Sequence, residues 1–217
     1  MRVKVSGLTT LEDARLCAGL GADYLGFVQT PGDARYIAPE GVREILTWVV
    51  GPEPVGIFED APLDTVLSAC RAAGFRHVRL DGHEPPTTGR ALREAGLAVI
   101  RTVRVHHDAS AEQVRALLAP HAEAFDYACL DVGGTSLLGG PGESLSWRIV
   151  RALAEEVPLF LAGPLTAANV AEAMRMRPFA LDLSAPGEVA DGETTGLLDF
   201  EALGAFFDAF RAAAADG

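Results

Sequence analysis

The sequence contains few cysteines, few basic residues and no long apolar run, and each shortage argues against a class of protein. Its three cysteines, Cys17, Cys70 and Cys129, are odd in number and far apart in the chain, which argues against a disulfide framework and indicates a reducing compartment. Their spacing matches no metal-ligand motif, so we expect no metal site. No apolar run approaches the roughly 20 residues of a membrane span, and residues 1–7 lack the apolar core of a signal peptide. We therefore expect a cytoplasmic protein without a membrane partner.

Basic residues are scarce relative to acidic ones. Lysine and arginine together number 18 against 30 aspartates and glutamates, which leaves a net charge of −12 on 217 residues. A field of this sign repels phosphate backbones, so we expect no nucleic-acid partner. The length and the 49% hydrophobic content fit one large domain or two small ones with an ample core.

Short apolar runs alternate with segments of helical pattern along the whole chain. Such alternation implies parallel strands, because each crossover connection carries a helix back across the sheet. Eight units without a linker favour a closed (β/α)8 TIM barrel, a single α/β domain over residues 1–217. The alternative is an open doubly wound sheet, but its G-x-G-x-x-G turn is missing after the first strand. The expected strands are 3–5, 24–28, 54–58, 77–80, 98–105, 127–130, 159–161 and 179–183, and the expected helices are 10–20, 39–50, 63–73, 87–95, 110–118, 146–156, 166–174 and 200–214.

Candidate site residues stand at the C-terminal ends of the expected strands, where barrels of this kind carry their active sites. Polar residues at these ends include Ser6, Asp81, Asp131 and Asp182. Lys4 lies two residues before Ser6 and shares its face of the strand, so we expect it to supply a fixed positive charge beneath the mouth of the barrel.

Glycines cluster after the expected sixth and seventh strands, at positions 133–134, 139–140, 142 and 163. Backbone amides at glycine-rich loop-to-helix junctions suit a phosphate group. The phosphate sites of these barrels commonly lie late in the chain, which favours that interpretation. The simpler interpretation is that these glycines only form tight turns.

Several blocks at these strand ends carry a family resemblance. They include Val3-Lys4-Val5-Ser6-Gly7-Leu8-Thr9, Gly139-Gly140-Pro141-Gly142 and Ala180-Leu181-Asp182-Leu183-Ser184. Further blocks lie in the right order at 12–14, 21–28, 35–37, 56–58, 78–82, 130–131, 161–163 and 169–170. Together they resemble the phosphoribosylanthranilate isomerase family over nearly the whole chain.

This resemblance implies an Amadori rearrangement in tryptophan biosynthesis, without metal or organic cofactor. The small phosphorylated substrate N-(5-phosphoribosyl)anthranilate becomes 1-(2-carboxyphenylamino)-1-deoxyribulose 5-phosphate. A general acid protonates the furanose ring oxygen, and a general base removes the C2 proton of the Schiff-base intermediate. By resemblance the acid is Asp131, whereas the position of the family's general-base cysteine holds Ser6. We expect a monomer or a homodimer.

The resemblance and the strand ends together define the remaining candidate site. The candidate substrate contacts are Arg35, Asp182, Lys4 and Asp81, and the candidate phosphate contacts are Gly140, Gly142, Gly163, Ser184 and Ala185.

Two departures from the family keep the chemistry open. A serine hydroxyl is a very weak base that needs an activator, unlike a cysteine thiol. Arg79 and Asp81 also stand where the family usually has glutamine and histidine. Three hypotheses remain. The chain performs the isomerisation, slowly or with another base such as Asp81 or Asp182; it binds a sugar phosphate without turnover; or it is an isomerase of changed specificity on a related phosphorylated sugar.

Overall fold

The structure is a computed structural model that describes residues 1–105, 109–132, 145–184 and 198–215. Its strands are β1 (Arg2–Ser6), β2 (Tyr24–Val28), β3 (Glu53–Phe58), β4 (His77–Leu80), β5 (Ala98–Val105), β6 (Tyr127–Val132), β7 (Leu159–Ala162) and β8 (Ala180–Ser184). They form a closed parallel barrel in chain order, in which β8 pairs with β1. The predicted (β/α)8 barrel is confirmed, and the open sheet is excluded.

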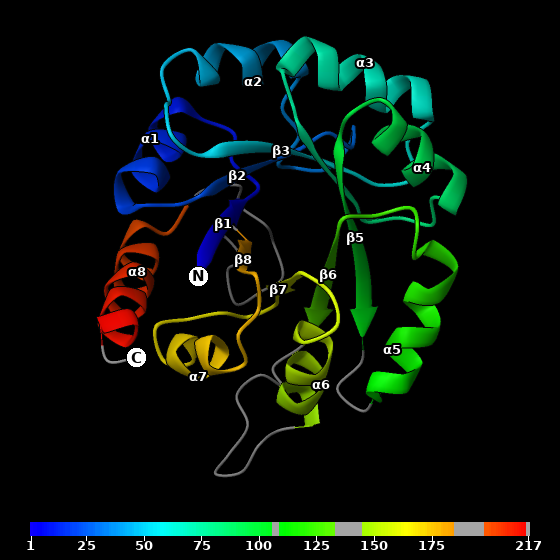
Figure 1. The fold of residues 1–217 in the computed structure, drawn as a ribbon. Helices are drawn as coiled ribbons and strands as arrows, with labels where there is room; N and C mark the ends of the chain where they lie inside the picture. The colour runs from blue at the N-terminus through cyan, green and yellow to red at the C-terminus, as the bar shows by residue number, and fades with distance from the viewer. Residues whose placement is uncertain (106–108, 133–144, 185–197, 216–217) are drawn as a thin grey trace.

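The helices form an outer ring around the barrel (Figure 1). They are α1 (Leu11–Leu20), α2 (Pro39–Leu46), α3 (Leu63–Ala73), α4 (Pro86–Glu94), α5 (Ala111–Leu118), α6 (Leu145–Ala154), α7 (Val170–Arg175) and α8 (Phe200–Ala215), with a short 3-10 helix at Ala119–His121. The ring closes where α8 lies beside α1 (Figure 1), and the Arg211 guanidinium donates to the Leu20 carbonyl at 3.1 Å. The first and last helices therefore complete the ring together.

Local capping signals explain why several helices begin and end where the sequence predicts. The Thr10 hydroxyl accepts from the Asp13 amide at 3.1 Å at the start of α1. Gly21 ends that helix with φ 98°, a left-handed conformation that glycine adopts without a Cβ clash. Ser110 and Gln113 form a reciprocal capping box at the start of α5.

Two helix boundaries differ from the prediction by four residues because side chains compete for backbone groups. Helix α2 ends at Leu46 rather than at residue 50, since the Thr47 hydroxyl donates to the Glu44 carbonyl at 2.6 Å and β-branched valines follow. Helix α7 begins at Val170 rather than at residue 166. The Asn169 side chain accepts from the Thr166 amide and donates to the Pro164 carbonyl, both at 2.8 Å, and so holds these residues in a turn.

Side chains alternate along each strand between two apolar cores. One core lies between the strands and the helices and includes Val5 and Phe27. The other fills the inside of the barrel, with members that include Cys129 of β6 and Ala180 of β8. Residues two positions further along the same strands, such as Asp182, therefore face into the C-terminal mouth.

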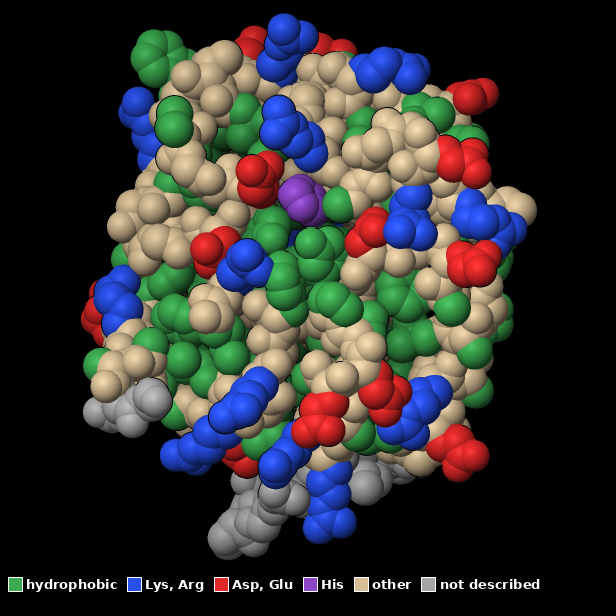
Figure 2. Space-filling model, viewed as in Figure 1, with side chains coloured by type: hydrophobic (Ala, Val, Ile, Leu, Met, Phe, Trp, Pro, Cys, Tyr) green, Lys and Arg blue, Asp and Glu red, His purple; other side chains and the backbone are tan. Residues whose placement is uncertain are grey.

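The outer surface shows no gathering of one charge on the face in view. Acidic and basic side chains are interspersed over it, with hydrophobic side chains between them (Figure 2). Among the described residues, no helix is long and apolar enough to cross a membrane.

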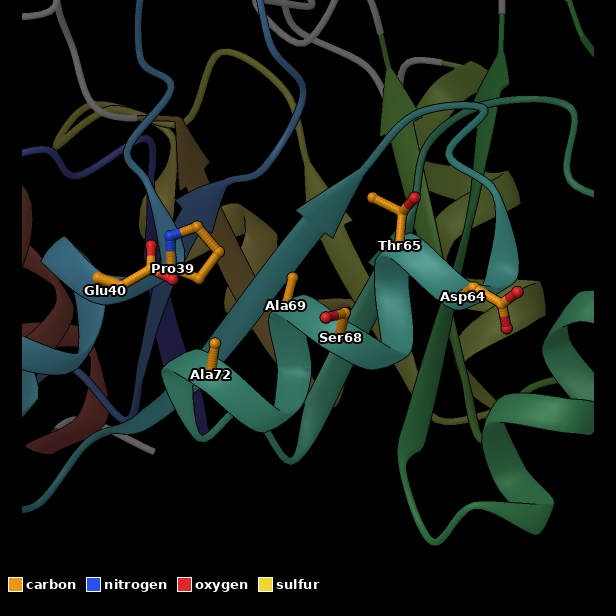
Figure 3. Close-up of a pocket in the computed structure, with 7 residues that line it drawn as sticks. All are labelled: Pro39, Glu40, Asp64, Thr65, Ser68, Ala69 and Ala72. Atoms are coloured by element: carbon orange, nitrogen blue, oxygen red, sulfur yellow. The ribbon is translucent and has the colours of Figure 1, made fainter.

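A groove of about 420 Å³ lies in the helical layer between α2 and α3 (Figure 3). It is lined by Pro39, Glu40, Asp64, Thr65, Ser68, Ala69 and Ala72. Because these residues belong to outer helices, the groove is separate from the mouth of the barrel.

Candidate active site

A buried polar cluster of Lys4, Ser6 and Asp182 lies at the junction of β1 and β8. The register that puts Lys4 opposite Asp182 brings the two side chains together. The Lys4 ammonium donates to Asp182 Oδ1 at 3.0 Å, to Oδ2 at 2.8 Å and to the Ser6 hydroxyl. The hydroxyl in turn donates to Asp182 Oδ1 at 2.7 Å. All three residues are at most 4% exposed, so these hydrogen bonds replace those that the polar groups would otherwise form with water.

Gly26 makes room for the Ser6 side chain. It lies opposite Ser6 on the neighbouring strand β2. A Cβ added at Gly26 would stand 2.8 Å from Ser6 Oγ and 3.0 Å from Ser6 Cα. These separations are shorter than ordinary van der Waals contacts, so any larger residue here would displace the serine.

A second polar cluster is formed by Arg79 of β4, Asp81 just after that strand and Thr102 of the neighbouring strand β5. Arg79 donates through Nε and Nη2 to the two Asp81 oxygens, each at 2.6 Å, which is a bidentate pair. Thr102 donates to Asp81 Oδ1 at 2.6 Å. Arg79 also donates through Nη1 to Asp182 at 2.8 Å and so joins this cluster to that of Lys4 and Ser6.

The two clusters fix the ionisation of their members differently. Burial raises the pKa of Asp81, but the Arg79 charge and the hydrogen bonds from Arg79 and Thr102 outweigh it and lower the pKa to about 2. Burial lowers the pKa of Lys4 more than the Asp182 carboxylate raises it. Burial raises the pKa of the Cys129 thiol to about 12, so this thiol is neutral at physiological pH. Asp81 is therefore a fixed anion, unsuited to exchanging protons near neutrality.

Asp131 has the opposite character to Asp81. It follows Cys129 by two residues on β6 and so faces the mouth, with a side chain 32% exposed. Burial raises its pKa, and the charges of Asp81 and Asp182 reinforce this against the opposing Arg79 and Arg104. Arg104 Nε forms an ion pair with Asp131 Oδ2 at a separation of 4.0 Å. Asp131 thus has a greater tendency than Asp81 to carry a proton.

Loops at the mouth are anchored by a third set of charges. The buried Glu84 carboxylate accepts from the Asp60 amide and from Arg101, both at 2.8 Å. Arg101 also donates to the Gly82 carbonyl at 2.8 Å. This arrangement holds the ends of the loops after β3 and β4 together.

The other predicted site residues have simpler surroundings. Arg35 forms a bidentate pair with Asp33 at 2.8 and 3.0 Å, within a loop near the charges of Arg79 and Asp81. Gly163 has φ 143° just after β7, and Ser184 is exposed at the end of β8. The remaining predicted phosphate contacts, Gly140, Gly142 and Ala185, lie outside the described residues.

Sequence reasoning did not single out two residues that the geometry makes relevant. Arg104 follows Thr102 by two positions on β5, so strand alternation already indicated its side of the sheet. Gly26 carries no chemical signal of its own, and its role becomes visible only through the register between β1 and β2.

Comparison with known proteins gives one consistent answer. Residues 3–209 match the family model described as N-(5'phosphoribosyl)anthranilate (PRA) isomerase. The isomerase of that name from Rubrobacter xylanophilus is 35% identical over 199 residues, which cover 91% of this chain and 94% of the relative. The one from Gloeobacter violaceus is 34% identical over 189 residues, covering 85% and 83%.

Solved structures agree with the sequence comparisons. The phosphoribosyl anthranilate isomerase of Thermus thermophilus superposes with a TM-score of 0.79 at 33% identity, covering 98% of this chain and 99% of that one. The Thermotoga maritima enzyme gives a TM-score of 0.80 at 30% identity with the same coverage. This chain therefore belongs to the N-(5'-phosphoribosyl)anthranilate isomerase family.

Proposed function

We propose that this protein is an isomerase that converts N-(5-phosphoribosyl)anthranilate to 1-(2-carboxyphenylamino)-1-deoxyribulose 5-phosphate. One observation carries the assignment of its site. Ser6 ends β1 and Asp131 lies one residue before the end of β6, both on the inner face of one barrel mouth, where the surroundings leave Asp131 more readily protonated than Asp81. A related isomerase has been solved with the reduced form of this product, at 28% identity and a TM-score of 0.78.

In this proposal Asp131 is the general acid that opens the ribose ring. A raised pKa increases the protonated share of the carboxyl near neutral pH. The proton passes to the furanose ring oxygen as the C1–O bond breaks and the Schiff base forms. A general base then removes the C2 proton of the Schiff base, on the side of the site where Ser6 lies. These steps move only protons and electron pairs within the substrate, so no metal or organic cofactor enters the proposal.

Binding is assigned to groups around the mouth. We assign the substrate phosphate to the amides near Gly163 and Ser184, together with the glycine loop that includes Gly140 and Gly142 and with Ala185. Arg35 is assigned to an anionic group of the substrate, since its planar fork suits a carboxylate or a phosphate. Lys4, Asp81 and Asp182 line the site beneath the substrate.

A fluorescence assay of purified protein with phosphoribosylanthranilate generated in situ tests the proposal. We expect turnover, and we expect the gene to rescue a tryptophan auxotroph that lacks this isomerase. Asp64→Asn is a matched control for Asp131→Asn, because Asp64 is exposed on α3 in the outer groove (Figure 3). Binding of the reduced product without any turnover would favour a sugar-phosphate-binding barrel. Turnover of a different phosphorylated sugar would favour changed specificity.

We further propose that residues 1–217 act as one barrel domain, as a monomer or a homodimer, in the cytoplasm. The free, buried state of all three cysteines supports a reducing compartment. Light scattering of the purified protein measures the oligomeric state directly.

A further inference from the structure

We infer that Ser6 and Asp182 together form the base of the reaction: the Ser6 hydroxyl takes the C2 proton while its own proton passes to Asp182. The inference rests on the proposed isomerase function and names the group that finally holds the proton. A hydroxyl alone is too weak a base for this step, so its hydrogen-bond acceptor decides whether the step is feasible.

The hydrogen bonds around Ser6 give its proton a defined direction. The Lys4 ammonium has three N–H donors, and its three contacts are the Ser6 hydroxyl and the two Asp182 oxygens. A fully protonated ammonium accepts nothing, so the hydroxyl proton points to the acceptor 2.7 Å away, Asp182 Oδ1. Within the described residues, the Ser6 hydroxyl forms hydrogen bonds with these two partners, Lys4 and Asp182.

Charge balance explains why Lys4 is the donor and not the base. The buried layer holds two cations, Lys4 and Arg79, against two anions, Asp81 and Asp182, all joined by short contacts. A neutral Lys4 would leave this layer with an uncompensated buried negative charge, which is costly. Lys4 therefore remains an ammonium that holds the serine and the carboxylate in place.

The surroundings of Asp81 and Cys129 exclude these two residues as the base that takes the C2 proton. The Asp81 carboxylate is committed to Arg79 and Thr102, each at 2.6 Å. The Cys129 thiol is wholly buried within the apolar filling of the barrel. Asp182 is thus the carboxylate that contacts the residue at the family's base position.

The step balances in atoms and charge. The C2–H bond breaks, its electron pair forms the C1–C2 double bond, and the C1–N π pair returns to nitrogen, which neutralises the iminium. The C2 proton forms a new O–H bond on Ser6, and the original Ser6 proton forms an O–H bond on Asp182. The positive charge of the substrate iminium and the negative charge of Asp182 disappear together, so the net charge of the buried layer plus bound substrate stays the same. In the following tautomerisation C1 takes a proton from the Ser6–Asp182 pair, and the proton of the C2 hydroxyl passes to Asp131.

The test compares kcat and its pH dependence in wild type, Ser6→Ala and Ser6→Cys, with Gly19→Ala as a control. Gly19 is exposed on α1, and a Cβ there meets nothing within 4 Å. We expect Ser6→Ala to lower kcat about 10²–10⁴-fold while binding of the reduced product persists. The ascending limb of the wild-type profile should not lie in the range of a thiol or an amine, because the group that finally takes the proton is a carboxylate. In Ser6→Cys it should move toward the range of a thiol, near a pKa of about 8.5.

A second variant keeps the inference testable through Asp182. Asp182→Asn should lower kcat about 10²–10⁴-fold, and the double variant with Ser6→Ala should lose little more, because the two groups act in one step. If Asp182→Asn does not fold, the pH profiles of wild type and Ser6→Cys still test whether Ser6 and Asp182 form the base.

Two results would overturn the relay alone. One is an active wild type whose Ser6→Ala variant keeps its kcat, and the other is a wild-type ascending limb above neutral pH, which would make neutral Lys4 the base. A wild type that binds the reduced product and never turns over substrate would instead remove the proposed function.

Discussion

The inside of the barrel has two halves of opposite character. Toward the N-terminal ends of the strands lies an aromatic layer, and toward the C-terminal ends lies a charged layer. The aromatic layer comprises Tyr24, His77, Tyr127, Phe160 and Phe179, with ring centroids 4.8–6.5 Å apart. The charged layer comprises Lys4, Arg79, Asp81, Asp131 and Asp182. Strands of only four to eight residues thus pass from an apolar core to the candidate site.

The difference shows how one barrel separates stability from chemistry. Aromatic rings in edge and tilted contacts gain dispersion and bury large areas without needing partners of matched charge. The charged layer instead needs each buried group to be paired, and pairing of this kind adds little net stability. We therefore expect substitutions in the aromatic layer to reduce stability first, and those in the charged layer to reduce activity first.

The largest effect is expected for Asp131→Asn. An amide does not donate a proton to the ring oxygen as a carboxylic acid does, so kcat should fall about 10²–10⁴-fold. Stability should hardly change, because Asp131 is one-third exposed and its recorded ion-pair partner lies 4.0 Å away. Steady-state kinetics and thermal unfolding measure the two quantities. A variant that keeps its kcat would remove Asp131 from the acid role.

Phe160→Ala should show the reverse pattern. Phe160 is wholly buried, with ring centroids 5.5 Å from Tyr24 and 5.6 Å from Tyr127. The cavity left by its ring should cost about 3–5 kcal/mol of unfolding free energy. The kcat of the folded fraction should stay close to that of wild type. Urea unfolding and kinetics corrected for folded fraction test this, and a large loss of kcat in the folded fraction would break the proposed separation.

The sequence predicted the barrel because its signals are local. Short apolar runs and capping residues such as Thr10 before α1 and Ser110 before α5 are signals that act within a few residues of each other. The same locality explains the errors at Leu46 and Val170, where side-chain hydrogen bonds of Thr47 and Asn169 end α2 early and start α7 late.

The sequence also placed Ser6, Asp131 and Asp182 at strand ends, but it did not distinguish the roles of the carboxylates. Asp81 and Asp182 looked equivalent as alternative bases. Their difference depends on Arg79, which forms its bidentate pair with one and a single hydrogen bond with the other. Such pairing depends on the register of strands that are distant in sequence, which no local pattern specifies.

Acid should destabilise the charged layer through Asp81. Its folded-state pKa of about 2 lies below the ordinary value of 3.8. The resulting stability is present above pH 4 and is lost as the pH falls toward 2, because the unfolded chain binds the proton first. The shift corresponds to about 2 kcal/mol. Unfolding free energy measured between pH 5 and 2 should fall in wild type with a smaller slope in Asp81→Asn, and equal slopes would contradict the assignment.

The smallest effect is expected for His77 of the aromatic layer, whose protonation should lower the unfolding free energy at a higher pH than that of Asp81. Burial lowers the pKa of His77 below its ordinary value of 6.5, and its Nδ1 has no hydrogen-bond partner in the described part of the chain. Its contribution is present above pH 6.5 and is lost as the pH falls through the folded-state pKa, since protonation puts a charge among rings such as Tyr24, 5.4 Å away. His77→Phe removes both the titration and the unpartnered nitrogen. Its unfolding free energy should therefore decline less than that of wild type between pH 7 and 5, while kcat at pH 7 stays unchanged. Parallel declines would show that the aromatic layer does not respond to acid in this range, and that the acid sensitivity of the barrel lies in its charged half alone.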